Sequence, residues 1–175
     1  DSSCNTKTTT SNATSAGGTP KVVGTYYATA SVAASTNYSA GSASCTKAVV
    51  INKATNTVTI TSKTYTYDGN GHATTATATS GTPTVVYYSD SSCNTKTTTP
   101  NATSAGGTPK IVGTYYATAS VAASTNYNAG SASCTKAVVI TQVQCNAPTN
   151  VSISTAGKVT WTASSNCSSA QHQVS

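Results

Sequence analysis

Apolar and polar residues alternate along several short stretches of this chain, as they do in β-strands that bury one face. In residues 57–61, Val58 and Ile60 alternate with threonines, and in residues 72–79 alanines largely alternate with threonines. Residues 84–88 form a short apolar run that ends in two tyrosines. These patterns predict strands, because the apolar positions of a helix would recur every three or four residues.

Two longer stretches predict further strands. Alternate positions from Tyr115 to Val121 are apolar and share one face, and residues 132–140 predict a closing strand whose alternation is interrupted at Lys136. Tyr65 and Tyr67 continue the pattern of residues 57–61. The sequence Asp-Gly-Asn-Gly at residues 68–71 predicts a turn, because these residues tolerate positive φ angles. A loop rich in Ser and Thr is expected over residues 89–109.

Composition supports an all-β chain. The 175 residues include 37 Thr, 26 Ser and 26 Ala but no Leu, Phe, Met, Arg or Glu, so most good helix formers are missing. Val, Ile, Tyr and one Trp remain to build a core, and they suit pleated sheets. A flexible glycosylated stalk is the alternative for such a composition, but ten tyrosines favour packed strands. No apolar run approaches the ~18 residues of a membrane-spanning helix.

The chain contains a long internal repeat. Residues 1–51, here called the first copy, recur at residues 90–140, the second copy, with 48 of 51 positions identical. The differences are Ser11/Pro100, Val22/Ile111 and Ser39/Asn128. The offset of 89 residues is close to the ~100 residues of an immunoglobulin-type sandwich, so one period is expected to form one domain.

Residues 52–89, here called the front segment, directly precede the second copy, and the first copy has no such segment before it. The sequence therefore predicts half a domain in residues 1–51, a complete domain in residues 52–140 and the start of another in residues 141–175. The first half-domain is expected either to belong to a longer polypeptide or to be completed by another chain. The linkers between domains are short, which favours a semi-rigid rod over flexibly joined domains.

Several motifs occur in the order found in one domain family. They are Tyr67-Asp68-Gly69 after a strand rich in Thr and Lys, the sequence GTYYATA at residues 113–119, Asn126-Tyr127, and the closing strand Val138-Val139-Ile140. Residues 54–140 resemble the MBG, or YDG, Ig-like repeat of bacterial surface proteins, and the first copy resembles its second half. The resemblance implies a structural Tyr-Asp-Gly turn and tandem β-sandwiches in large secreted or cell-surface proteins, often adhesins.

The C-terminal part resembles a different family. Residues 148–154 and 157–163 look like the first two strands of a fibronectin type III domain, with Trp161 as its core tryptophan. Residues 171–174 would begin a third strand, with His172 where that family usually has tyrosine. The expected fold is therefore all-β, with tandem Ig-like β-sandwiches tied by disulfides and arranged as beads on a string.

Six cysteines predict a disulfide framework. Equivalent cysteines of a repeat should pair equivalently, so the spacing of 41 residues in both copies favours three bonds, which are Cys4–Cys45, Cys93–Cys134 and Cys145–Cys167. Zinc sites need much closer Cys or His spacings. Persistent disulfides predict an oxidising location, extracellular or at the cell surface. Interchain disulfides between neighbouring rods are the alternative pairing.

Candidate catalytic groups are few. Asp1, Asp68 and Asp90 are the only acids, and the first and last are equivalent positions of different copies, so paired-carboxylate hydrolysis is not expected. Asp68 and His72 could join a serine in a triad, but the simpler interpretation is a turn residue and a strand start. An isopeptide bond from Lys63 would also need Asp68. The sequence predicts no catalytic residue, cofactor or metal site, and three acids are few for calcium.

Surface chemistry suggests other partners. The net charge is +6, but the nine lysines are scattered and Arg is absent, so no nucleic-acid interface is expected. Outward threonines in residues 57–61 and 73–79 are candidates for binding ice or crystalline polysaccharide, and Tyr38 and Tyr127 for stacking on sugars. Sequons of the type Asn-x-Ser/Thr predict glycosylation sites at Asn12, Asn37, Asn101, Asn150 and Asn166.

Together these features predict a structural segment of a long extracellular repeat protein. It would act as a stiff stalk or as the repeating unit of a cell-surface filament or adhesin, with no enzymatic activity. Its expected partners are neighbouring domains or further copies in a fibre, with glycans as additional partners. The alternative is a carbohydrate- or ice-binding module that uses the Thr and Tyr surfaces.

Overall fold

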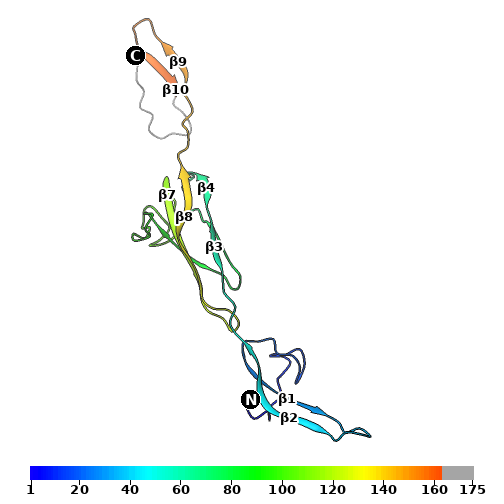
Figure 1. Ribbon diagram of the computed structural model, residues 1–175. Coiled ribbons are helices and arrows are strands. Elements are labelled where there is room, and N and C mark those ends of the chain that lie inside the picture. The colour runs from blue at the N-terminus through cyan, green and yellow to red at the C-terminus, as the bar shows by residue number, and fades with distance from the viewer. Residues whose placement is uncertain (163–175) are drawn as a thin grey trace.

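The computed structural model describes residues 1–162, and every regular element within them is a β-strand (Figure 1). The all-β prediction is therefore confirmed. None of the described residues forms a helix that could cross a membrane. The strands fall into three groups that follow one another along an elongated chain: a hairpin in the first copy, a six-stranded central unit, and a C-terminal hairpin (Figure 1).

The central unit contains two sheets. One has four strands in the order β4-β8-β7-β6, namely Lys63–Thr66, Gly130–Thr141, Gly113–Val121 and Thr84–Tyr88. Its strands are antiparallel except for β4, which runs parallel to β8. The other sheet pairs β3 (Val58–Thr61) with β5 (Thr75–Ala78), and β3 lies against β7 and β8. The front segment thus supplies four of the six strands.

The core of the molecule lies between these two sheets. It consists of small and aromatic side chains from the larger sheet, namely Tyr87, Tyr115, Ala117, Ala137, Val138 and Ile140. Ile60 of β3 packs against them, as do Tyr65 and Val85. The prediction of one apolar face from Tyr115 to Ala119 is confirmed, since alternate residues of that stretch are buried. The core is small because Ala and Val supply much of it.

A β-bulge explains the interrupted alternation at Lys136. Tyr115 pairs with Val138, but Tyr116 pairs with Lys136, so Ala137 is an extra residue on β8. As a result the adjacent residues Ala137 and Val138 are both buried, while Lys136 stays exposed. A strict period of two cannot hold across a bulge.

Tyr65, which continues the apolar pattern of residues 57–61, lies in a separate strand and packs against the core. The chain leaves β3 at Ser62 and passes to the other sheet, where β4 pairs with β8 instead of β5. Tyr67 lies beyond β4, and its N–H still donates to the Thr141 carbonyl at 2.9 Å. The apolar alternation that runs through residues 58–66 is therefore divided between strands of two different sheets.

Outside the central unit, the described strands form hairpins. The first copy pairs β1 (Gly24–Val32) with β2 (Gly41–Ile51). The C-terminal hairpin pairs β9 (Thr149–Ile153) with β10 (Val159–Thr162). Trp161, expected in a core, has 38% of its surface exposed, since within residues 1–162 no second sheet packs on this hairpin. Residues 163–175, including His172 and the proposed third strand, lie outside the described residues.

Candidate functional site

One site joins the first copy, the linker at residues 52–57 and a loop of the central unit. It is formed by the loop at residues 122–129, which connects β7 to β8 in the central unit. Ala54, just after the first copy, donates to the Asn126 carbonyl at 2.8 Å and accepts from the Asn128 N–H at 2.9 Å. The Asn126 side-chain Oδ1 accepts a hydrogen bond from the N–H of Val23 at 3.1 Å. We call this contact the junction.

A lysine adds a further hydrogen bond to the junction. The Lys53 ammonium donates to the Ser124 carbonyl at 2.8 Å. The loop itself is closed by a hydrogen bond from the Ser124 N–H to the Tyr127 carbonyl at 3.0 Å. The junction therefore holds the linker, the start of β1 and the tip of the next unit in one network.

The first copy carries the equivalent loop at residues 33–40, with Ser39 in place of Asn128, and it is not part of a junction within residues 1–162. It is closed in the same way, by a bond from the Ser35 N–H to the Tyr38 carbonyl at 2.9 Å. Tyr38 is 77% exposed, whereas its equivalent Tyr127 is half-buried and forms a bridge with Ala54. The Asn-Tyr pairs, expected to stack on sugars, thus include one at the junction and one in solvent.

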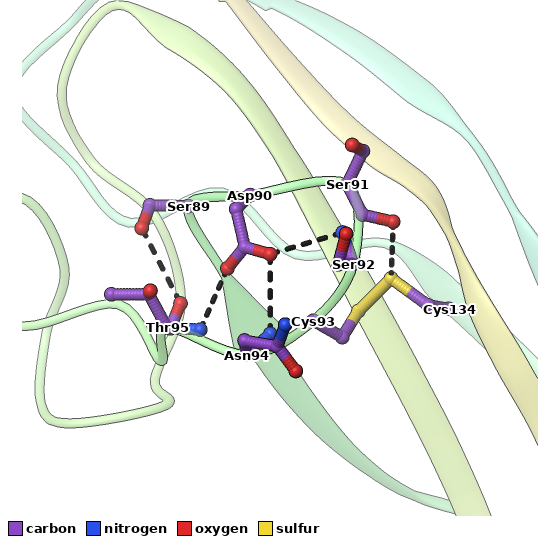
Figure 2. Close-up of a disulfide and its surroundings, with 8 residues drawn as sticks. All are labelled: Ser89, Asp90, Ser91, Ser92, Cys93, Asn94, Thr95 and Cys134. Carbon is purple, nitrogen blue, oxygen red and sulfur yellow. Dashed lines mark hydrogen bonds between the residues drawn. A yellow bond between two sulfur atoms is a disulfide. The ribbon is translucent and has the colours of Figure 1, made fainter.

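Each copy also has a disulfide-tied loop built around an aspartate, and Figure 2 shows the loop of the second copy. In the second copy, Asp90 Oδ1 accepts from the N–H groups of Ser92 and Asn94 at 3.0 and 3.2 Å, and Oδ2 accepts from Thr95 at 2.6 Å. These backbone hydrogen bonds lower the pKa of Asp90 from its usual value, and the bond from Thr95 has the largest effect. The carboxylate therefore shapes the turn that presents Cys93.

The disulfides join these loops to the closing strands. Cys93 bonds to Cys134 of β8, and Cys4 bonds to Cys45 of β2, as the repeat predicts. Asp1 accepts the equivalent backbone hydrogen bonds in the first copy. Cys145 is also disulfide-bonded, while Cys167, its expected partner, lies outside the described residues. The bonds are consistent with an oxidising environment.

Beyond Cys93, the same loop holds strand β6. The Thr97 N–H donates to the Tyr87 carbonyl at 3.0 Å, and the Tyr87 N–H donates to the Gly106 carbonyl at 3.0 Å. The buried Thr97 hydroxyl donates to the Gly107 carbonyl at 2.8 Å. The Tyr87 hydroxyl accepts from the Thr74 N–H at 2.9 Å, and burial raises the pKa of Tyr87. Tyr87 therefore anchors the front segment to the second copy.

The structure brings Asp68 and His72 together. His72 Nε2 lies 2.9 Å from Asp68 Oδ1, and the imidazole stacks on Tyr65 with ring centroids 4.3 Å apart. The Asp68 carboxylate accepts hydrogen bonds from Asn70, and these lower the pKa of Asp68, the bond from the backbone N–H most strongly. The hydrogen bond with His72 lowers this pKa by less. No Ser or Thr hydroxyl among residues 1–162 bonds to His72. Lys63 is exposed, which does not favour a buried isopeptide bond.

The outward threonines form a ladder across the β3–β5 sheet. Thr59 pairs with Thr77 and Thr61 with Thr75, and the Thr59 and Thr77 hydroxyls lie 2.7 Å apart. Thr57 follows in the same row, and its N–H donates to the Thr79 hydroxyl at 3.3 Å. All six side chains belong to exposed residues. The ladder is thus a row of exposed threonine pairs across the two strands and their ends.

The remaining candidate sites are the glycosylation sequons and possible metal ligands. The described sequon asparagines are all exposed, namely Asn12, Asn37, Asn101 and Asn150, while Asn166 lies outside the described residues. Within the described part of the chain, no three His, Cys, Asp or Glu side chains gather as metal ligands.

The sequence analysis missed the junction residues, because Val23, Lys53 and Ala54 carry no motif. The available signal was the near-identity of the Asn-Tyr loops in both copies, which differ only at Ser39 and Asn128. No protein-family model matches the chain, and no curated protein or solved structure matches it either.

Proposed function

We propose that this chain is a structural segment of a long extracellular repeat protein, in which it serves as a stiff stalk or as the repeating unit of a cell-surface filament or adhesin. The observation that supports this most is the junction, where the loop at residues 122–129 binds the linker and Val23 of the preceding repeat. A contact between near-identical repeats can propagate along an array, since each new repeat brings the same loop.

The junction favours stiffness for a physical reason. It contains three hydrogen bonds between residues 53–54 of the linker and the loop at residues 122–129, and one from Val23 of the first copy to Asn126. Each is worth only about 0.5–1.5 kcal/mol in exposed surroundings, but they act on a linker of a few residues. The linker bonds fix residues 53 and 54 to the central unit, and a bend between Ile51 and Lys53 would have to break the bond from Val23.

Domain type and location belong to the same proposal. The order of the Tyr-Asp-Gly turn, the GTYYATA strand and the closing strand supports an MBG-type Ig-like sandwich for residues 52–140. The pattern around Trp161 supports the start of a fibronectin type III-like domain. Disulfides in both copies support an extracellular location. The exposed sequon asparagines support glycan decoration of such a stalk.

Electron microscopy of native cells and their shed material, labelled with antibodies against this chain, tests the proposal. We expect label on fibres or thin rods outside the cell, with a regular axial spacing. Label inside cells, or on compact particles of one shape, would contradict it. Antibodies against a β9–β10 peptide serve as a control, because they should label with a longer spacing if that hairpin does not repeat.

The threonine ladder supports a second candidate function, binding to ice or to crystalline polysaccharide. Two exposed Thr pairs lie on the hydrogen-bonded strands β3 and β5, and a third, Thr57 with Thr79, lies just beyond them, so the spacing within the strands is fixed by the sheet. The test is adsorption of the full chain to ice or cellulose. Thr59→Lys should abolish adsorption, whereas Thr46→Lys on β2, also exposed, should leave it unchanged. Equal adsorption by both variants would exclude this function.

A further inference from the structure

The first copy leaves uncovered a sheet face that the second copy buries. Val49 is 39% exposed, whereas its equivalent Val138 is fully buried. Ala28 is exposed where Ala117 is buried. Both outer edges of the β1–β2 hairpin also lack a neighbouring strand among the described residues, although in the central unit β4 and β6 occupy the equivalent edges. This surface therefore offers a binding partner both exposed apolar side chains and the backbone groups of open strand edges.

A cavity of about 370 Å³ lies against this surface. Its walls come from the disulfide-tied loop and from β1, including Thr8, Gly17, Gly18, Tyr27, Ala28 and Thr29. The volume is within the range of specific ligand pockets. Asp1 and the disulfide-bonded Cys4 also line the cavity.

The equivalent positions of the second copy hold strand β6. Tyr87 pairs with Ala117 and Val86 with Thr118, and the backbone of Tyr87 bonds to Thr97 and Gly106. In the first copy, the residues equivalent to these four partners of β6 are Ala28, Thr29, Thr8 and Gly17, each 89 positions earlier. All four line the cavity of the first copy.

The backbone bond that frames the cavity forms without a strand in it, while the equivalent hydroxyl contact is longer than in the second copy. The Gly17 N–H donates to the Thr8 carbonyl at 2.9 Å, and the equivalent bond from Gly106 to Thr97 measures 2.7 Å. The Thr8 hydroxyl lies 3.5 Å from the Gly18 carbonyl, against 2.8 Å for Thr97 and Gly107. A site that is formed before binding loses less entropy when its ligand arrives.

We propose that the first copy binds an extended polypeptide segment with the sequence pattern of β6, Thr-Val-Val-Tyr-Tyr, donated by the front segment of a further repeat of the same kind. The first tyrosine of the segment enters the cavity. Its N–H donates to the Gly17 carbonyl, its carbonyl accepts from the Thr8 N–H, and its strand pairs with β1. This is strand addition to a sheet edge, with a side-chain pocket providing specificity.

A fusion tests whether the surface accepts a front segment. A second copy of residues 52–89 is placed ahead of Asp1 in the otherwise complete chain, which recreates the Ser-Asp join found at Ser89 and Asp90. We expect amide hydrogen exchange in residues 26–29 to slow by at least about a hundredfold, as locally open amides become part of a cooperative sheet. The control fusion carries Tyr87→Ser in the added segment only and should stay unprotected.

Addition of a peptide tests binding between separate chains. An unlabelled peptide of residues 80–91 is titrated into the isotope-labelled full chain. We expect saturable NMR shifts at Thr8 and Gly17, with their equivalents Thr97 and Gly106 unchanged as an internal reference. Ala28→Lys should abolish the shifts, whereas Ser31→Lys, exposed and outside the cavity lining, should preserve them.

Three results would overturn the inference. One is unchanged exchange in residues 26–29 of the fusion, and another is peptide binding that Ala28→Lys does not weaken. The third is dimerisation of the chain through this face with which the peptide does not compete, since a second copy would then be the occupant. The inference rests on the proposed array of repeats, but its failure would leave the junction, and hence the proposed stalk, unaffected.

Discussion

The first and second copies have almost the same sequence, but their surroundings differ. Val138 is fully buried and Val49 is not, and Tyr127 lies at the junction while Tyr38 is in solvent. Nothing in the three differing positions explains this contrast. The front segment explains it, because its strands cover the second copy and have no counterpart over the first among the described residues. Burial is thus a property of the assembled unit and not of the repeat alone.

What the two copies share is equally informative. Both hairpins have the same β-bulges, the same disulfide and a positive φ at the first cysteine, 55° at Cys4 and 53° at Cys93. Both loops are organised by an aspartate at the same place. The local geometry of the repeat therefore persists without its covering sheet, which is what a modular array requires.

The largest expected difference between the copies follows from a charge in the core. Val138→Asp should lower the free energy of unfolding of the central unit by at least about 3 kcal/mol, because it buries a carboxylate without a partner. Val49→Asp at the equivalent exposed position should change stability by less than about 0.5 kcal/mol. Urea denaturation with hydrogen exchange for each copy measures both. Equal losses would mean that the first copy is covered in solution.

Removal of a disulfide should come next in size. The double substitution of Cys93 and Cys134 by Ser should cost the central unit about 2–4 kcal/mol, since the unfolded chain gains freedom. The matched change at Cys4 and Cys45 should raise hydrogen exchange in the first copy and leave the second copy unchanged. A loss that spreads to both copies would contradict independent tethering.

A threonine substitution sharpens the comparison further. Thr97→Val removes the buried hydroxyl that bonds to the Gly107 carbonyl and should cost about 1–3 kcal/mol. Thr8→Val, in the uncovered cavity, should cost less than about 0.5 kcal/mol. Thermal unfolding of each variant gives the two values. A similar cost at both positions would show that Tyr87 adds nothing to this bond.

The smallest effect concerns acid. The pKa of Asp90 is lowered from 3.8 by backbone hydrogen bonds, so the stability it provides is present above the unfolded pKa and is lost as pH falls through the lower, folded pKa. In a carboxyl NMR titration the midpoint of Asp90 should fall below 3.8. Asp90→Asn should remove this contribution to the pH dependence below about pH 4. A midpoint at or above the usual value would mean that the loop is open.

The alternation in the sequence was sufficient to predict most strands, because one face of β3 and β7 is buried and the other is solvated. It could not place the bulge at Ala137 or the change of sheet at Ser62, since both depend on pairing with distant strands. Cysteine spacing predicted the disulfides of the copies, because the repeat removed the ambiguity. The junction was not predictable, since Val23 and Lys53 are ordinary residues whose role depends on contact with the next unit.

The most direct test of the stalk is the relative motion of the first copy and the central unit in solution. Residual dipolar couplings of the labelled full chain report an alignment tensor for each part. A stiff junction predicts the same axes and magnitude for both. Asn126→Ala should reduce the magnitude in the first copy, whereas Asn37→Ala, at the equivalent loop outside the junction, should not. Independent tensors in the unmodified chain would contradict the account.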